Sequence, residues 1–85
     1  MNMDKPKFTQ TTDSCGPIFR AEYKGMRLEM GLNKNWLNII DDQSHCECCL
    51  VEGVNVVSDS GECVTGEWSD ADWTSVGNAV REAVS

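Results

Sequence analysis

Two neighbouring segments of the chain alternate apolar and polar residues, and this alternation constrains the fold more than any other feature. Residues 18–24 and 26–32 both repeat with a period of two, which is typical of β-strands with one buried face. A two-residue turn at Lys24-Gly25 brings the apolar residues of both segments onto one face. We therefore predict a β-hairpin. Its expected cross-strand pairs are Phe19–Met30, Ala21–Leu28 and Tyr23–Met26.

The segments on either side of this hairpin differ in character. A turn at residues 33–35 followed by apolar residues in 36–40 predicts a third strand and completes a meander. The expected pairs between the second and third strands are Leu32–Leu37 and Met30–Ile39. Residues 1–14 are polar and without periodicity, so we expect a flexible arm that ends at a turn at Cys15-Gly16-Pro17. The compact domain is then expected to span residues 15–85.

The pattern is weaker after residue 40. Residues 41–49 show neither strand nor helix periodicity and are predicted to form a loop. The Val-rich residues 50–58 predict a fourth strand. Residues 59–61 (Asp-Ser-Gly) predict a turn, and residues 63–68 predict a fifth strand.

The C-terminal segment has the features of a helix with a defined start. Ser69 is a favourable N-cap, and Asp72 three residues later gives a spacing like that of a capping box. Trp68 and Trp73 have the spacing of a hydrophobic staple. One apolar stripe at helical spacing consists of Trp73, Val76, Val80, Ala83 and Val84. The predicted fold class is therefore α+β, an antiparallel sheet of about five strands with one helix packed on one face.

Acidic residues are concentrated in the second part of the chain. The 85 residues carry a net charge of −7. Residues 1–35 contain six basic and four acidic residues, whereas residues 36–85 contain one basic residue and ten acidic ones. Such a field either keeps a small protein soluble or complements a basic surface on another protein. The second interpretation predicts a partner-binding surface of Asp41, Asp42, Glu47, Glu52, Asp59, Glu62, Glu67, Asp70 and Asp72, with Trp36 as an aromatic anchor.

The same features argue against several classes of function. An excess of acid disfavours direct binding to nucleic acid or to an anionic membrane, since both need a surplus of Lys and Arg. Residues 1–10 lack the apolar core of a secretory signal, so we expect a cytoplasmic location. No phosphate loop, nucleophile elbow or HExxH pattern is present. Adjacent His45 and Cys46 are a poor nucleophile pair, because catalytic partners converge in space. We therefore expect a protein that is not an enzyme.

Five cysteines are present, and three of them lie in residues 46–49. Reduced, partly buried thiols are the first interpretation in a reducing compartment, and no cofactor is then expected. The alternative is a structural zinc site, because Cys46 and Cys49 have the spacing for two of four ligands. The remaining ligands would be Cys15 and Cys63, with His45 as a substitute. A further alternative, a thiol redox protein, requires a thiolate with a lowered pKa.

Small size, acidity and the lack of catalytic motifs together favour a function in protein binding. As an analogy of size and charge alone, the profile resembles small acidic inhibitors of phages and other mobile elements. Those proteins block nucleic-acid-handling host machinery such as restriction and CRISPR–Cas complexes. The leading hypothesis is an inhibitor or adaptor that mimics nucleic acid in the basic groove of a larger protein. A zinc-stabilised interaction module is the alternative, and homodimer formation is left open.

Overall fold

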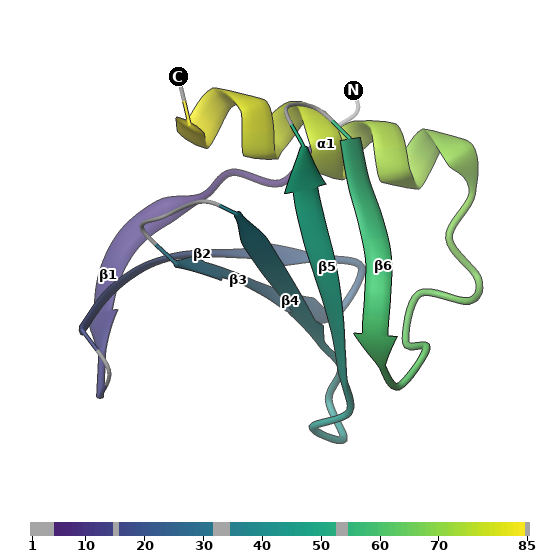
Figure 1. Cartoon of the computed structure of the whole chain (residues 1–85), viewed down its shortest axis with the longest axis horizontal. Helices are drawn as coiled ribbons and strands as arrows, with labels where there is room; N and C mark the ends of the chain where they lie inside the picture. The colour runs from purple at the N-terminus through teal and green to yellow at the C-terminus, as the bar shows by residue number, and fades with distance from the viewer. Residues whose placement is uncertain (1–4, 15, 32–34, 53–54, 85) are drawn as a thin grey trace.

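Six antiparallel strands follow one another across the sheet in the order of the sequence (Figure 1). The computed structural model describes residues 5–14, 16–31, 35–52 and 55–84. A single helix, α1 (Asp70–Val84), lies across one face of the sheet in this part of the chain. The α+β class with an antiparallel sheet and a C-terminal helix is thus confirmed. The strands are β1 (Thr9–Asp13), β2 (Gly16–Tyr23), β3 (Met26–Gly31), β4 (Trp36–Ile40), β5 (Cys46–Glu52) and β6 (Asn55–Gly61).

The hairpin of β2 and β3 has the predicted register. Its cross-strand pairs include Phe19–Met30, Ala21–Leu28 and Tyr23–Met26. The turn consists of Lys24 at φ 51° and Gly25 at φ 78°, both in the left-handed region. Positive φ at both central residues gives a two-residue turn the twist that matches the flanking strands. The alternation in the sequence and the turn chemistry therefore specify the same register.

The register between β3 and β4 differs from the prediction by two residues. Met30 lies opposite Leu37 and Leu28 opposite Ile39, instead of Met30 opposite Ile39. A shift of two residues keeps the same side chains on the buried face, because side chains alternate with a period of two. Leu32, the other predicted partner, lies outside the described residues.

An edge strand forms within the segment that we predicted to be a flexible arm. β1 pairs with β2 from Thr9 opposite Arg20 to Asp13 opposite Gly16. Residues 16 and 17, assigned to a turn, belong to β2. The strand is Thr-rich, and threonine favours extended backbone, but its polar sequence shows no apolar alternation. For that reason periodicity did not reveal it.

The remaining strands also differ from the prediction. Residues 46–49 belong to β5 and not to a loop, and the chain reverses between Glu52 and Asn55 where one strand over 50–58 was expected. β6 includes residues 59–61, and residues 64–67 form turns in place of the predicted fifth strand. β5 carries a glutamate at a buried position, and β6 is exposed along nearly its whole length. Neither strand therefore shows the apolar alternation on which the prediction relied.

Helix α1 starts as its sequence predicts. The Ser69 Oγ accepts a hydrogen bond from the Asp72 N–H at 3.3 Å, and the Asp72 carboxylate accepts one from the Ser69 N–H at 2.8 Å. This reciprocal pair is a capping box with Asp in place of Glu. The rings of Trp68 and Trp73 meet edge to face with centroids 4.9 Å apart, as a hydrophobic staple requires.

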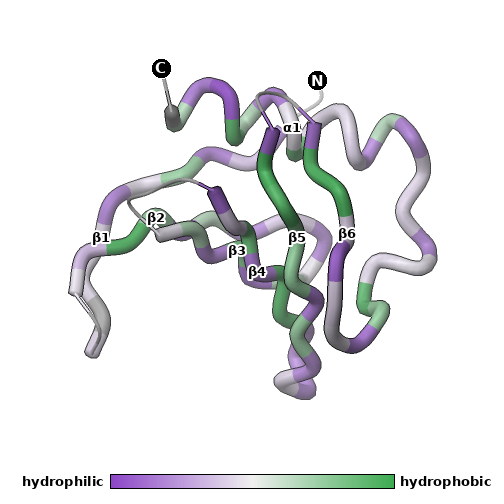
Figure 2. The backbone as a smooth tube through the Cα atoms, in the orientation of Figure 1, coloured by the Kyte–Doolittle hydropathy of each residue, from purple (hydrophilic) through white to green (hydrophobic). Residues whose placement is uncertain are grey.

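The apolar core lies between the sheet and the helix. Val76 and Val80 of α1 are fully buried against side chains of β2 to β5. In Figure 2 the half of β6 nearest to α1 is apolar, whereas its other half is hydrophilic. No helix in the described ranges is long and apolar enough to cross a membrane. The buried cluster consists of Ala21, Tyr23, Leu28, Met30, Leu37, Ile39, Cys49, Val76 and Val80.

Candidate functional site

Six exposed carboxylates border the β6 side of the molecule. Strand β6 carries one, and the segment from β6 to the start of α1 carries three, along one side of the fold (Figure 1). The other two lie at opposite ends of β5, in the β4–β5 connection and at the last residue of β5. We call this set the acidic edge. Its members are Asp42, Glu52, Asp59, Glu62, Glu67 and Asp70.

The basic residues come from other parts of the sequence than most of these carboxylates. The sequence contains no Lys or Arg between Lys34 and Arg81. Among the described residues, the ion pairs formed by Lys and Arg are Lys5–Glu82, Arg20–Glu29, Arg27–Glu29 and Lys24–Asp72. Within the described residues, none of these ion pairs neutralises a carboxylate of the acidic edge.

Glu47, a member of the predicted partner-binding set, is inside the protein. Only 1% of its surface is exposed, so it cannot contact a partner in the folded state. Its Oε1 accepts hydrogen bonds from the backbone N–H of Thr65 at 3.0 Å and from the Thr65 hydroxyl at 2.8 Å. These bonds fasten the turn at residues 64–67 to β5. Glu47 thereby fixes the segment that carries Glu62 and Glu67.

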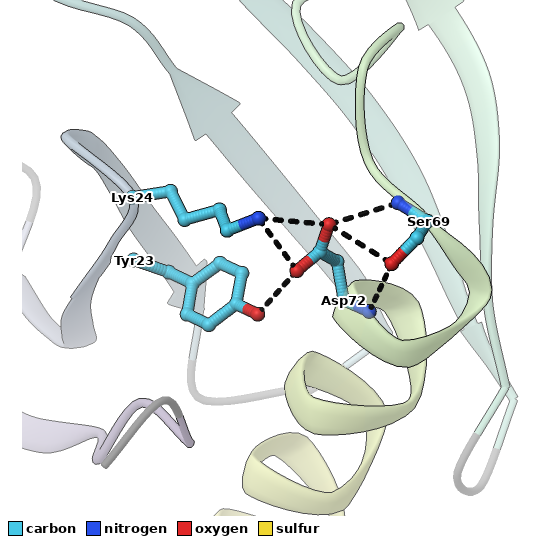
Figure 3. Close-up of polar contacts among 4 residues, drawn as sticks. All are labelled: Tyr23, Lys24, Ser69 and Asp72. Atoms are coloured by element: carbon cyan, nitrogen blue, oxygen red, sulfur yellow. Dashed lines mark hydrogen bonds and ion pairs between the residues drawn. The ribbon is translucent and has the colours of Figure 1, made fainter. Parts of the chain in front are cut away.

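Asp72, also predicted to bind a partner, is a buried link between α1 and the β2–β3 turn (Figure 3). Its carboxylate accepts a hydrogen bond from the Tyr23 hydroxyl at 2.7 Å and pairs with the Lys24 ammonium at 2.9 Å. The Ser69 N–H, the Tyr23 hydroxyl and Lys24 hold the pKa of Asp72 well below its ordinary value. Burial raises the pKa of Tyr23, which keeps its hydroxyl a donor. The role of Asp72 is therefore to stabilise the folded structure.

Asp41 is used within its own loop. Its Oδ1 accepts hydrogen bonds from the N–H groups of Gln43 at 2.9 Å and His45 at 2.8 Å, and its Oδ2 lies 3.3 Å from His45 Nδ1. Partial burial raises the pKa of Asp41, but these N–H groups outweigh it and leave the pKa below its ordinary value. Ser44 has φ 69°, as the tight reversal requires. Asp41 is thus a turn residue, and Asp42 beside it is the exposed one.

Trp36, the predicted aromatic anchor, lies on the face of the sheet opposite the core. It is 43% exposed, and Leu50 lies opposite it on β5. Val57 of β6, which is 50% exposed, lies opposite Leu50 in turn. The three side chains therefore form an apolar row on the uncovered face, ending at the acidic edge. The sequence does not place Leu50 and Val57 side by side, because it predicts one strand over residues 50–58 in place of the hairpin of β5 and β6.

The predicted metal ligands do not converge within the described residues. Successive side chains on β5 alternate in direction, so Cys46 and Cys49 point to opposite faces, and Cys49 is part of the core. No group of three His, Cys, Asp or Glu side chains in the described ranges could hold a metal ion. Cys15 lies outside the described residues. Burial raises the pKa of both Cys46 and Cys49, opposite to the shift that a reactive thiolate needs.

These differences predict the order of thiol labelling. Cys63 is exposed, whereas Cys49 is fully buried and its burial raises its pKa to about 12. Since the thiolate is the nucleophile, we expect iodoacetamide at pH 8 to modify Cys63 about a hundredfold faster than Cys49. Mass spectrometry of peptides after timed labelling measures both rates, and labelling in denaturant provides the control in which they become similar. Equal rates in the native protein would contradict the burial of Cys49.

A recess lies where β6 approaches the first turns of α1. Its volume is about 310 Å³. Trp73 and Thr74 of the helix line it on one side, and Glu52 and residues at the beginning of β6 line it on the other. The sequence predicts Trp73 in the hydrophobic staple and in the apolar stripe of the helix. It does not reveal the place of Trp73 beside β6, because β6 is not recognisable there as a separate strand. The lining residues are Glu52, Asn55, Val56, Val57, Trp73 and Thr74.

Comparisons with known proteins indicate no function, so the candidate site is inferred from the surface of the molecule. No family model, no curated protein and no solved structure matches the chain. The acidic edge, the Val57 end of the apolar row and the recess meet at the β6 side of the sheet. This side of the molecule is therefore the candidate functional site.

Proposed function

We propose that the protein is a non-enzymatic binding protein whose acidic edge occupies a basic surface of a larger protein. The observation that carries this proposal is the separation of charge: six exposed carboxylates border β6, and the described Lys and Arg ion pairs lie elsewhere. An unneutralised patch of one sign focuses the field and speeds encounter with a surface of opposite sign. Glu47 and Asp72 support it indirectly, because they hold the acidic segment in place.

The partner surface that fits best is one that otherwise holds nucleic acid. Such surfaces collect Lys and Arg to neutralise phosphates, and spaced carboxylates offer them a similar pattern of charge. The exposed apolar row that ends at β6 provides the uncharged contact area that a protein interface needs at its centre. The proposed activity is therefore inhibition or adaptation of nucleic-acid-handling machinery by occupation of its basic groove. A phage or another mobile element is the proposed origin of such a protein.

Charge reversal tests the acidic edge against a matched site. Once a partner has been isolated with the full chain, we expect Glu67→Lys to weaken binding about fivefold, because a rim carboxylate becomes a repelling cation. Glu22→Lys changes the net charge equally at an exposed position of β2, outside the acidic edge, and we expect less than about a twofold change. Isothermal titration calorimetry at about 0.05 M and about 0.3 M salt should also show weaker binding at high salt. Equal effects of the two reversals would contradict the proposal.

Competition tests the mimicry part of the proposal. A short nucleic-acid duplex should displace the protein from the isolated partner, because both ligands need the same cations. Simultaneous binding of duplex and protein would exclude mimicry and leave an adaptor that binds elsewhere. The comparison of Glu67→Lys with Glu22→Lys tests the role of the acidic edge, and it does not depend on the result of this competition.

A further inference from the structure

The recess between β6 and α1 differs from the rest of the acidic edge because it combines a carboxylate with apolar walls. Val56 and Trp73 are apolar residues of its lining, and among the described residues there Glu52 is the only ionisable one. At about 310 Å³ the recess is near the lower end of the range for small-molecule sites, and it is open to solvent. These features favour a protruding side chain over an enclosed ligand.

The chemistry of the lining selects a cation on an aliphatic stem. Arg and Lys side chains bury their methylene groups on apolar surface and keep the charged head at a polar rim. A tryptophan ring is the best aromatic partner for such a cation, and a nearby carboxylate adds a direct ion pair. Trp73 and Glu52 offer both groups at one recess. A neutral or anionic side chain would gain neither the contact of a cation with the tryptophan ring nor the ion pair with the carboxylate.

The strand beside the recess can hold the main chain of the same partner segment. β6 is the last strand in the sheet order, so within the described chain its outer edge has no paired strand. An edge of this kind pairs with an added strand, and pockets beside it select alternate side chains. A second copy of this chain is disfavoured as the occupant, because it would bring two acidic edges together.

We infer that the recess binds an Arg or Lys side chain from an extended basic segment of the partner, which pairs with β6. This inference rests on the proposed function and adds the form of the partner: a strand-like segment with cationic side chains at alternate positions. Glu52 and Trp73 receive one of these side chains. The other carboxylates of the acidic edge attract the segment without fixing its position.

A defined peptide tests the inference with the full chain. The probe is a capped seven-residue peptide of alternating threonine and arginine, with a citrulline-for-arginine version as its neutral counterpart. We expect Glu52→Gln to weaken binding of the arginine peptide about fivefold and Glu62→Gln to weaken it less than about twofold. Both residues are exposed carboxylates of the acidic edge, and both changes remove one negative charge. Calorimetry measures the affinities, and the citrulline peptide should show no difference between the variants.

Main-chain pairing is tested separately by hydrogen exchange. Peptide binding should slow exchange of outward-facing amides in β6, and a peptide N-methylated at alternate residues should lose this effect. Equal weakening by Glu52→Gln and Glu62→Gln would overturn the inference, because the edge would then act through charge alone. The proposed function would survive that outcome, since it depends on Glu67→Lys against Glu22→Lys. Unchanged β6 exchange with the arginine peptide would likewise overturn the inference.

Discussion

Replacing Asp72 with asparagine should lower the melting temperature by roughly 10 °C, because one carboxylate joins the helix start to the β2–β3 turn. Its Oδ1 accepts from Tyr23 at 2.7 Å, and its Oδ2 accepts from the Ser69 N–H at 2.8 Å and from Lys24 at 3.1 Å. An asparagine can replace only one of these oxygens. Its amide nitrogen would face donors at the other position. Thermal unfolding followed by circular dichroism measures the change.

Asp70→Asn is the matched control. Asp70 lies in the same first turn of α1, is exposed and loses the same charge on substitution. Its interaction with the helix dipole is small and screened by salt, so we expect a change within about 2 °C. Equal losses for the two variants would show that the charge of the first turn stabilises the helix, and that the contacts with Tyr23 and Lys24 contribute little.

The effect of Asp72 should also depend on pH. A carboxyl whose pKa is lowered by folding stabilises the protein at pH values above its ordinary pKa of 3.8. That contribution is lost as the pH falls from this value towards the lower pKa of the folded state. The difference between wild type and Asp72→Asn should therefore stay constant from neutral pH to about pH 5 and shrink below about pH 4. A difference that does not shrink in acid would contradict the role of the charged carboxylate.

The parts of the fold that the sequence predicts best are those in which each element buries one face. β2 and β3 alternate because one face packs on the core, and α1 carries an apolar stripe for the same reason. β1 and β6 are edge strands and largely exposed, so they lack an apolar face to signal their presence. β5 buries Glu47 on its core face and carries Cys46, Cys48 and Leu50 on the other face, so its sequence shows no apolar alternation. Periodicity detects strands that bury one apolar face, and it misses strands that do not.

The sequence predicts the candidate site only in part, for a similar reason. Composition alone located the acid after residue 40, but it could not separate surface carboxylates from buried ones. The capping box indicated a local role for Asp72, yet its partners Tyr23 and Lys24 are nearly fifty residues away in sequence. Glu47 likewise finds Thr65 only through the fold. Sequence therefore predicted the region of the acidic edge, and tertiary contacts determine its members.

The buried position of Glu47 leads to a second prediction with a large effect. Replacing it with alanine should cost about 2–4 kcal/mol of folding free energy, because two buried donors of Thr65 lose their acceptor and a cavity remains. Glutamine should cost less than about 1 kcal/mol, since both bonds go to Oε1 and an amide oxygen can accept them equally. Urea denaturation at neutral pH measures both values.

The contrast between the two variants tests whether Glu47 acts as a hydrogen-bond acceptor or as a charge. Glu62→Ala removes an exposed glutamate from the same part of the fold and should change stability by less than about 0.5 kcal/mol. Hydrogen exchange of the Thr65 amide should rise sharply in Glu47→Ala and stay near wild type in Glu47→Gln. If glutamine proves as damaging as alanine, the negative charge itself is required. In the acceptor role, Glu47→Gln keeps the turn fastened to β5, and the acidic edge should retain its affinity for the partner.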